Sequence, residues 1–242
     1  MDAWQGKKAL VTGASGGIGS AVVRTLQSLG VTVTGVDLQP GTADHNIAGD
    51  LMDPSFCDSL PQRAADAMGG LDFLVNNAGI ITRGKITETT DEDFTRTMAI
   101  NVEAPFRLCR AAIPLMAEAG GGAIVNVASC WGVHPGPNHP LYVMSKAAVA
   151  SLTQCLGMDH AHQNIRVNAV CPNEVNTPII ITGFATRGLD PDTAIAALNA
   201  SVPLGRIAEP EDIADVILFL LSDQARYLCG ALIEANGGKP VQ

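Results

Sequence analysis

The feature that most constrains the fold is a glycine-rich loop between a short apolar run and a helical pattern. Residues 8–12 (Lys-Ala-Leu-Val-Thr) are typical of a buried strand, and residues 20–29 carry apolar side chains at helical spacing. The loop between them has the spacing G-x-x-x-G-x-G, formed by Gly13, Gly17 and Gly19. Glycines let the backbone approach a pyrophosphate, and a helix N-terminus favours its charge. The pattern predicts a nucleotide-binding unit; taken alone, the loop could equally be a plain tight turn.

Strand-like and helix-like segments then alternate along the chain. Six further strands are expected at about 31–36, 46–48, 71–75, 123–128, 165–170 and 231–234, and helices at about 54–68, 91–119, 142–150 and 209–222. Alternation of this kind predicts an α/β fold, a doubly wound parallel sheet of about seven strands with helices on both faces. Because 242 residues suffice for one large core, we expect a single domain over 1–242.

Three connections carry their own expectations. Only about eight residues separate the second and third strands, fewer than the dozen that a crossover helix needs, so that helix should be lost or reduced to a turn. The segment 91–119 should form one helix or two joined at Pro105. Residues 173–206 are rich in Gly, Thr and Pro with a weak helical patch at 193–198, which predicts an irregular lid.

Two carboxylates are candidates for binding the adenosine half of a dinucleotide. Asp37 ends the second strand about 20 residues after the glycine loop, where an acidic side chain bonds ribose hydroxyls and repels a 2′-phosphate. Neither 38–41 nor the glycine loop supplies a cation, so NAD is favoured over NADP. Asp50 could face the adenine amino group or cap a helix, and Asp53 before Pro54 suits the capping role better.

A second pattern brings a phenol, an ammonium and a hydroxyl together. Tyr142 and Lys146 lie four residues apart, on one face of a predicted helix. A phenol with a pKa near 10 accepts protons poorly at neutral pH unless a positive charge favours its ionised form. Ser129, at the end of an apolar strand, could hydrogen-bond a carbonyl held against the phenol. An isolated Y-x-x-x-K is more often a surface pair, so this assignment depends on the other motifs.

Other polar residues have a functional and a structural reading. Asn101 lies in a half-buried helical pattern, where an asparagine is more often a satisfied structural residue than a catalytic one. The proline-rich loop 130–140 should form one wall of a substrate pocket and contains Trp131. His134 and His139, in the same loop, could bond a polar substrate or face solvent.

Composition excludes several classes of function. The formal charge of −9 offers no basic surface for nucleic acid or anionic lipid. No apolar run approaches the ~20 residues that span a bilayer, and the N-terminal residues lack the order of a signal peptide, so a cytoplasmic location is expected. The six cysteines show no metal-ligand spacing, and no metal is expected. Cys130 could border the site, but no histidine is obviously placed to activate it.

Taken together, the motifs resemble the short-chain dehydrogenase/reductase family over essentially the whole length. They are residues 12–19, Asp50, the Asn-Asn-Ala-Gly segment at 76–79, Asn101, Ser129, Tyr142 with Lys146, and residues 172–177. The resemblance implies a Rossmann-type fold with a cofactor-binding half at about 1–125 and a catalytic and substrate half at about 126–242. It also implies a homotetramer, a dimer of dimers, and apolar surfaces on the last helix and strand could supply a contact.

The resemblance assigns roles to the catalytic residues. Tyr142 would be the general acid/base, and Ser129 would hold the substrate oxygen. Lys146 would bind the nicotinamide ribose and lower the pKa of Tyr142, and Asn101 would hold a water in a proton relay. Ile18 would contact the cofactor through its backbone and Thr177 would bond the nicotinamide carboxamide. The full cofactor set expected is Gly13, Ser15, Gly17, Ile18, Gly19, Asp37, Asp50, Leu51, Asn77, Ala78, Gly79, Tyr142, Lys146, Pro172, Val175 and Thr177.

One departure from the family bears on the substrate. Where the family usually has Pro-Gly, this chain has Pro172, Asn173 and Glu174, which places an amide and a carboxylate at the predicted pocket floor. That suggests a substrate with several hydroxyls, although Glu174 could also face outward. Substrate contacts are expected from Ser129, Trp131, His134, His139, Tyr142, Asn173 and Glu174.

The sequence therefore predicts an NAD-dependent oxidoreductase that interconverts a small polar secondary alcohol (a sugar, polyol or hydroxy acid) and its carbonyl. A 3-oxoacyl-thioester reductase is the alternative, since residues 80–83 have some likeness to such enzymes. Asp37 and the acidic composition argue against it. A non-catalytic dinucleotide sensor is a third reading, disfavoured because Ser129, Tyr142 and Lys146 are all present.

Overall fold

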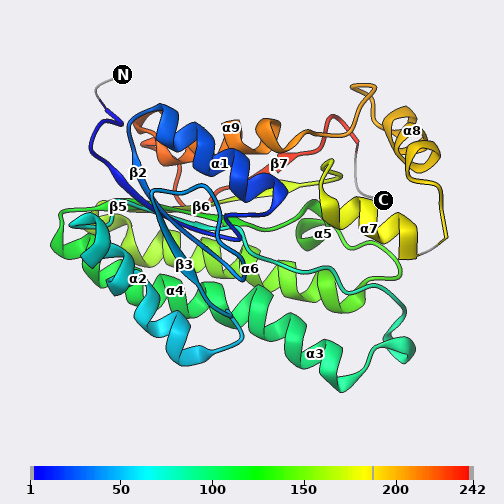
Figure 1. Ribbon diagram of the computed structural model, residues 1–242, viewed down its shortest axis with the longest axis horizontal. Coiled ribbons are helices and arrows are strands. Elements are labelled where there is room, and N and C mark those ends of the chain that lie inside the picture. Colours follow the sequence, from blue (N-terminus) through cyan, green and yellow to red (C-terminus); the bar gives the residue numbers. More distant parts are fainter. Residues whose placement is uncertain (1–2, 187, 240–242) are drawn as a thin grey trace.

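Seven parallel strands form one sheet in the computed structural model, which describes residues 3–186 and 188–239 (Figure 1). The spatial order is β3-β2-β1-β4-β5-β6-β7, and every neighbouring pair is parallel. The strands are β1 (Lys8–Thr12), β2 (Thr32–Asp37), β3 (His45–Ala48), β4 (Phe73–Asn76), β5 (Gly122–Val127), β6 (Ile165–Pro172) and β7 (Leu232–Ala235). The predicted fold class is confirmed, and all strand carboxyl ends meet at one edge of the sheet.

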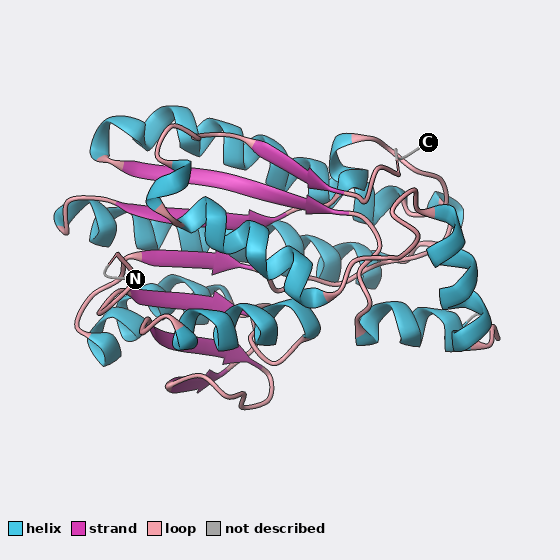
Figure 2. Cartoon of the chain, turned by 90° about the horizontal axis from the view of Figure 1, so that it is seen from above, coloured by secondary structure: helices cyan, strands magenta, loops and turns pink. Residues whose placement is uncertain are grey.

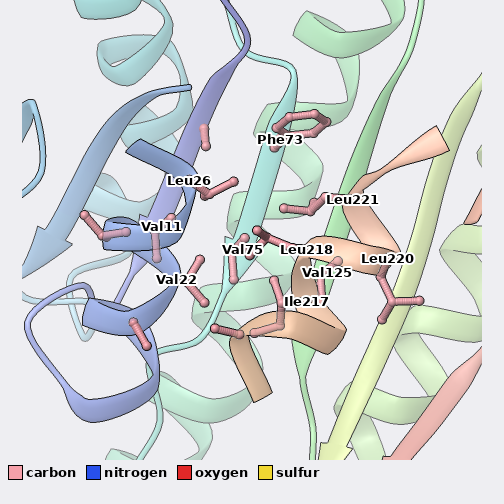
Figure 3. Packing of buried hydrophobic residues seen from close by; sticks show 14 of the residues in the cluster. Val11, Val22, Leu26, Phe73, Val75, Val125, Ile217, Leu218, Leu220 and Leu221 are labelled. Atoms are coloured by element: carbon pink, nitrogen blue, oxygen red, sulfur yellow. The ribbon is translucent and has the colours of Figure 1, made fainter. Parts of the chain in front are cut away.

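One face of the sheet is covered by α1 (Gly17–Ser28) and α9 (Pro210–Leu221). Figure 3 shows Val22 and Leu26 of α1 and Ile217 and Leu221 of α9 packed over the valines of the central strands. Alternate residues of a strand point to opposite faces, so Ala9 and Val11 join this cluster while Leu10 joins the cluster on the other side. Burial on both faces explains why the strands read as continuous apolar runs.

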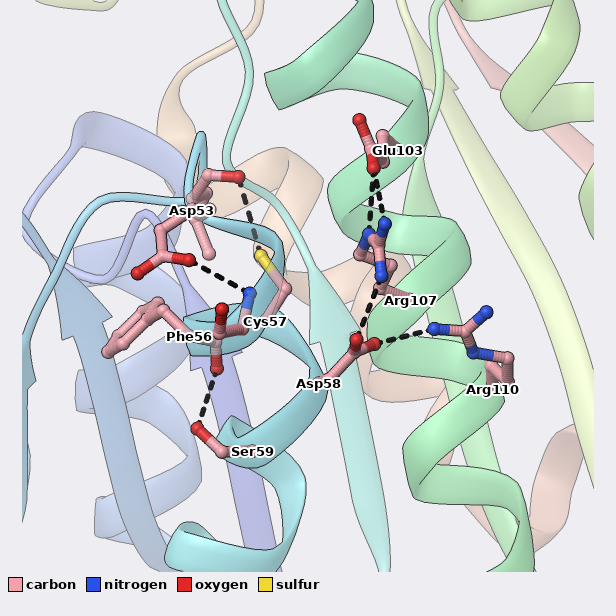
Figure 4. Close-up of polar contacts among 10 residues, drawn as sticks. Asp53, Phe56, Cys57, Asp58, Ser59, Glu103, Arg107 and Arg110 are labelled. Atoms are coloured by element: carbon pink, nitrogen blue, oxygen red, sulfur yellow. Dashed lines mark hydrogen bonds and ion pairs between the residues drawn. The ribbon is translucent and has the colours of Figure 1, made fainter.

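The other face is covered by α2 (Pro54–Met68), α4 (Ala104–Glu118) and α6 (Pro140–His160). As expected, Asp53 caps α2, accepting a hydrogen bond from the backbone N–H of Ser55 at 2.8 Å. Figure 4 shows Asp58 of α2 paired with Arg107 and Arg110 of α4 at 2.8 and 2.7 Å. These ion pairs are partly exposed and contribute little energy each, but they connect α2 to α4.

The helical pattern at 91–119 forms two helices, which was one of the two predicted alternatives. A π-turn, Ala99–Glu103, joins α3 (Asp91–Met98) to α4. The break precedes Pro105 because proline is tolerated in the first turn of a helix, where its missing N–H costs no hydrogen bond. The π-turn carries the buried Asn101 toward the edge of the sheet where the strands end.

The connections contain one confirmed prediction and two errors. No helix lies between β2 and β3, as predicted from the short link. Residues 173–206 are not mainly irregular, because they contain α7 (Pro178–Thr186) and α8 (Pro191–Ser201), which includes the weak helical patch. The loop predicted at 130–140 begins with a short helix, α5 (Cys130–Val133). Short 3-10 helices occur at Ile86–Glu88, Ala161–Gln163 and Asp223–Ala225.

Figure 2 shows α7 and α8 beside the carboxyl ends of the strands, where the cofactor and substrate residues were predicted. Among residues 3–186 and 188–239, no helix has the combined length and apolar character that crossing a membrane requires.

Candidate active site

A cleft of about 390 Å³ opens where the sheet order changes direction, between the loops that follow β1 and β4. Ligands of open α/β sheets bind at this topological switch point. The cleft runs from the glycine loop and Asp37 at one end to Tyr142 and Lys146 at the other, and Ile180 of α7 lies over it. Most of the predicted cofactor residues line it: Gly13, Gly17, Ile18, Asp37, Asp50, Leu51, Asn77, Ala78, Gly79, Tyr142, Lys146, Pro172, Val175 and Thr177.

The glycine loop fits a pyrophosphate. Helix α1 begins with Gly16 as its N-cap and has no side-chain capping hydrogen bond, so no side chain competes for the first backbone N–H groups. Gly13 has a φ of +64°, and a Cβ there would lie 2.8 Å from Asn77 Nδ2, so only glycine fits. Gly19 and Ser15 are absent from the cleft lining. Ser15 donates its backbone N–H to Asp37, and a Cβ at Gly19 would clash with the carbonyl oxygen of Gly13.

Asp37 is held at the far end of the cleft by two backbone groups. Its Oδ2 accepts from Ser15 N at 3.0 Å and its Oδ1 from Leu38 N at 2.7 Å. The carboxylate keeps further lone pairs for ribose hydroxyls. Asp50 also lines this end, and its Oδ1 accepts from Met52 N at 2.9 Å. With no helix after β2, Leu38 is left 65% exposed beside Asp37.

Thr12 is a supporting residue that the sequence analysis missed. Its hydroxyl accepts hydrogen bonds from the backbone N–H groups of Asn77 and Ala78, each at 3.1 Å. The Asn77 side chain returns to the glycine loop and donates to the carbonyls of Thr12 and Gly13 at 2.9 and 3.1 Å. These bonds fix the two loops that flank the cleft against each other. A threonine ending the first strand was the available signal.

The predicted catalytic residues converge at the other end. Tyr142 lies near the start of α6 and makes a side-chain hydrogen bond with Ser129, the N-cap of α5. Lys146 follows one turn later, with its Nζ 6.0 Å from the centre of the Tyr142 ring. Nζ donates to the carbonyl oxygen of Val127 at 2.7 Å. The hydroxyl pair can hold a carbonyl or alcohol oxygen, with an ammonium close by.

Burial controls the proton affinities of this cluster. Burial raises the pKa of Tyr142, whereas its hydrogen bond with Ser129 and the positive charge of Arg83 lower it. Burial also lowers the pKa of Lys146 to about 8, because the ammonium is removed from water. Without a cofactor, desolvation of the phenol is the largest effect on the Tyr142 pKa, and the expected lowering by Lys146 together with an oxidised cofactor stays a prediction.

Asn101 is committed to structural bonds. Its Oδ1 accepts from Ile80 N at 2.9 Å, and its Nδ2 donates to Ile80 O at 2.9 Å and to Ser145 Oγ at 3.0 Å. Both amide hydrogens are used, which leaves one Oδ1 lone pair for a water. The Asn101 side chain thus joins the loop after β4 to α6. The predicted role of Asn101 in a proton relay stays a prediction.

The expected substrate residues divide into two groups. Tyr142 and Asn173 line the cleft. The Trp131 ring packs edge-on against the His139 ring at a centroid distance of 4.5 Å, and neither lines the cleft. His134 Nε2 lies 3.1 Å from Glu234 Oε1 and is exposed.

The placement of Glu174 in the substrate pocket is wrong. Its Oε1 accepts from Lys239 Nζ at 2.7 Å, and its side chain lines a second, separate cavity with Arg206 and Asn236. The carboxylate turns away from the cleft because a cation near the end of the chain pairs with it.

Arg83 is a charged residue near the site that the sequence analysis did not assign. It follows β4 and its side chain is exposed, yet its charge reaches the phenol of Tyr142. Its guanidinium lies against the backbone of Gly183 in α7, where a Cβ would come within 2.7 Å of Arg83 Cζ. The available signal was a lone arginine four residues after the Asn-Asn-Ala-Gly segment.

Cysteine and metal chemistry find no support at this site. Cys130 is buried, its Sγ lies 2.9 Å from the carbonyl oxygen of Cys171, and burial raises its pKa to about 12, so it is a thiol at neutral pH. Within the described ranges, no group of three or more His, Cys, Asp or Glu side chains is placed to hold a metal ion.

Comparison with known proteins places this geometry in a family. Residues 13–239 match the family model described as enoyl-(acyl carrier protein) reductase, a branch of the short-chain dehydrogenases. The chain belongs to the short-chain dehydrogenase/reductase family. A curated relative, an uncharacterized oxidoreductase from Thermotoga maritima, is 35% identical over 97% of this chain and 98% of its own length.

Two solved structures of this family superpose closely. Ligand-free aldohexose dehydrogenase from Thermoplasma acidophilum has a TM-score of 0.93 and 29% identity, and covers 99% of this chain and 96% of its own. L-sorbose reductase from Gluconobacter frateurii, complexed with NADPH and L-sorbose, has a TM-score of 0.91 and 31% identity over 99% and 98% of the two chains. The chain is accordingly an oxidoreductase acting on alcohols or ketones, and its family uses nicotinamide dinucleotides.

Proposed function

We propose that this protein is an NAD-dependent dehydrogenase that interconverts a small polar secondary alcohol and its carbonyl, with sugars, polyols and hydroxy acids as the substrate class. The observation that carries the proposal is one cleft lined by Asp37 at its adenosine end and by Tyr142 and Lys146 at its other end, where Tyr142 hydrogen-bonds Ser129 behind the lining.

NAD as the cofactor is supported by Asp37. The carboxylate lines the cleft and is held in place by two backbone N–H groups, so it would bond ribose hydroxyls and repel a 2′-phosphate. When bound, NAD would accept a hydride from the alcohol carbon. The glycine loop would hold the pyrophosphate, and Thr177 and Lys146 the nicotinamide half. The similarity to an enzyme that binds NADPH makes this preference the first property to measure.

The chain's own residues would handle the proton. Ser129 would donate a hydrogen bond to the substrate oxygen, and the phenolate of Tyr142 would remove the hydroxyl proton as the hydride leaves. In the reverse direction, protonated Tyr142 would return that proton to the carbonyl oxygen. Lys146 would supply positive charge close to the phenolate.

The substrate class is supported by similarity and by the cleft. Two structurally similar proteins are named for sugar substrates, and Asn173 places a polar amide in the lining where the family usually has glycine. A 3-oxoacyl-thioester reductase is the second candidate, favoured by the similarity to a 3-oxoacyl-[acyl-carrier-protein] reductase from Thermotoga maritima, which is 33% identical over 97% of this chain. This candidate is disfavoured because its acidic carrier protein would be repelled by a chain with a formal charge of −9.

We further propose a homotetramer in the cytoplasm. Phe219 of α9 is 40% exposed and Tyr227, between α9 and β7 in the chain, is 99% exposed, in the part of the chain where the apolar contact was predicted. Size-exclusion chromatography with light scattering tests this assembly, and a monomeric mass would contradict it.

The function is tested by a spectrophotometric screen for reduced cofactor, with NAD and NADP in parallel against sugars, polyols, hydroxy acids and simple secondary alcohols. We expect turnover with NAD on a polyhydroxy compound. If only NADPH-driven reduction of oxoacyl thioesters appeared, the cofactor and the substrate class would both be wrong, while the role of Tyr142 would remain.

A further inference from the structure

The loop that carries Arg83 is fixed at three points. Ile80 is held at both backbone atoms by Asn101, and the hydroxyl of Thr82 bonds that of the buried Thr97. The backbone N–H of Gly84 donates to the carbonyl of Asn138 at 2.8 Å. An arginine between two such anchors starts from a fixed backbone although its side chain is exposed.

The guanidinium touches helix α7 at Gly183, and its charge acts on the phenol of Tyr142. The neighbours of Arg83 on both sides line the cleft, Ile80 and Ile81 from its own loop and Ile180 from α7. These lining side chains are apolar, Lys146 lines the same end of the cleft, and Arg83 lies beside this stretch without being one of the lining residues.

Negative charge is kept away from this end of the cleft. The carboxylates in the lining are Asp37 and Asp50, both at the adenosine end. Glu174 is paired with Lys239, and Glu234 lies against His134, and neither glutamate lines the cleft. An anion beside Tyr142 would therefore meet attraction from Arg83 without a lining carboxylate opposing it.

We propose that Arg83 is a substrate-specificity residue that binds an anionic group, so that the preferred substrate within the proposed class is a hydroxy acid and not a neutral sugar or polyol. A guanidinium presents five N–H donors in a planar fork, which matches a carboxylate in bidentate geometry. Arg83 also interacts within the protein, and a bound anion would compete with that interaction. The inference rests on the proposed function, since it assumes that the substrate oxygen lies at Tyr142.

The test is a binding measurement that does not require turnover. The enzyme is saturated with the reduced nicotinamide cofactor that it binds more tightly, so that a hydroxy acid forms a dead-end complex. Hydroxy acids of three to six carbons, each beside its uncharged carboxamide, are titrated by calorimetry. The proteins are the wild type, Arg83→Gln, Arg83→Lys and the surface control Arg226→Gln.

We expect wild type and Arg226→Gln to bind the best acid about 10- to 100-fold more tightly than its carboxamide, the value of a charge-assisted pair. Arg83→Gln should remove that difference and leave carboxamide binding within about threefold, and Arg83→Lys should keep part of it. Equal binding of acid and carboxamide by wild type would overturn the proposal. So would a Gln variant that weakens both ligands alike, because that is the effect of a merely structural arginine.

A second variant tests the geometry without changing the charge. The Cβ of Gly183→Ala would occupy the place of the guanidinium, while alanine favours a helix by about 1 kcal/mol over glycine, so α7 should persist. This variant should lose acid preference as Arg83→Gln does. Unchanged acid preference would show that the guanidinium binds elsewhere.

Turnover separates the two proposals. Acid-selective binding that depends on Arg83, with no oxidation of any panel compound, would contradict the proposed function and leave the anion site standing. Oxidation of neutral polyols with no acid preference would contradict the anion site and leave the dehydrogenase standing.

Discussion

The ammonium nitrogen of Lys146 lies 6.0 Å from the centre of the Tyr142 ring, one helical turn along α6. The lysine is not bonded to the phenol in this arrangement, because its Nζ donates to the carbonyl of Val127 at 2.7 Å. The side chain that bonds the tyrosine is Ser129. The two residues can therefore be separated by mutation.

Replacing Tyr142 by Phe removes only the hydroxyl. General acid/base groups contribute about 10²- to 10⁴-fold, so kcat should fall by that factor while cofactor affinity changes little. Stability should change by about 1 kcal/mol, the value of one hydrogen bond. Steady-state kinetics and cofactor titration measure both quantities. Activity near that of the wild type would refute Tyr142 as the proton carrier.

The pH profile should differ between the two directions of the reaction. Oxidation needs deprotonated Tyr142 and reduction needs the protonated form. Because burial raises the pKa of Tyr142, oxidation should speed up from pH 7 into the alkaline range, whereas reduction should change little up to about pH 10, since the phenol stays protonated there. Initial rates in both directions between pH 6 and 10 test this. Oxidation that is fastest at pH 6 would contradict the assignment.

Lys146 should make the unliganded protein less stable at neutral pH. Its pKa is about 8 in the fold, against about 10.4 for an ordinary lysine. Between these values the unfolded chain holds the proton and the fold does not, so this group's contribution to stability rises with pH across that window. The penalty is full below pH 8 and amounts to about 3 kcal/mol, at about 1.36 kcal/mol per pKa unit.

The variant Lys146→Met tests that penalty. Its gain in stability over wild type should be about 3 kcal/mol larger at pH 7 than at pH 10.4, although it should be inactive. Urea unfolding of both proteins at several pH values gives the difference directly. A difference that stays constant with pH would show that the ammonium is not desolvated.

Asp37 should set the cofactor preference. Asp37→Ser removes the charge that would repel a 2′-phosphate and weakens the bonds to the ribose, and its hydroxyl can still accept one backbone N–H. The ratio of kcat/KM for NAD over NADP should fall by about 100-fold, while the surface control Asp66→Asn should match wild type. An unchanged ratio would mean that another residue selects the cofactor.

The type and order of the helices and strands were predictable from the sequence where local signals sufficed. Helix α2 runs over Pro54–Met68 as predicted, because the Asp53-Pro54 cap marks its start and Gly69 its end. Helix α7 was missed because residues 180–183, Ile-Ile-Thr-Gly, have weak helix propensity. Helix α7 lies at the cleft, follows Thr177 and contacts Arg83. These tertiary contacts stabilise the helix, and they cannot be read from local helix propensity.

The orientation of site residues was less predictable. Glu174 turns away from the cleft because it pairs with Lys239, which lies 65 positions later in the chain. Arg83 approaches the site because Gly183 of another element leaves space for it. Both outcomes depend on which distant residues the sheet order brings together, and spacing along the chain does not carry that information.

Asn101 should act mainly through stability and loop order. Asn101→Ala would leave the backbone N–H and C=O of Ile80 without these partners, and the loss should cost about 2 to 4 kcal/mol. The matched variant Ser145→Ala removes a single bond of Asn101 together with the bond from Ser145 Oγ to Tyr142 O, and should cost about 1 kcal/mol.

Urea unfolding compares these two variants, and hydrogen exchange of the Ile80 amide should be faster in Asn101→Ala than in Ser145→Ala. Because Ile80 anchors the loop that carries Arg83, loss of that anchor should also weaken binding of a hydroxy acid in the dead-end complex. The asparagine does not hold the loop if Asn101→Ala loses no more stability than Ser145→Ala and the Ile80 amide exchanges at the wild-type rate. A role in proton transfer would then be the better explanation for the buried Asn101.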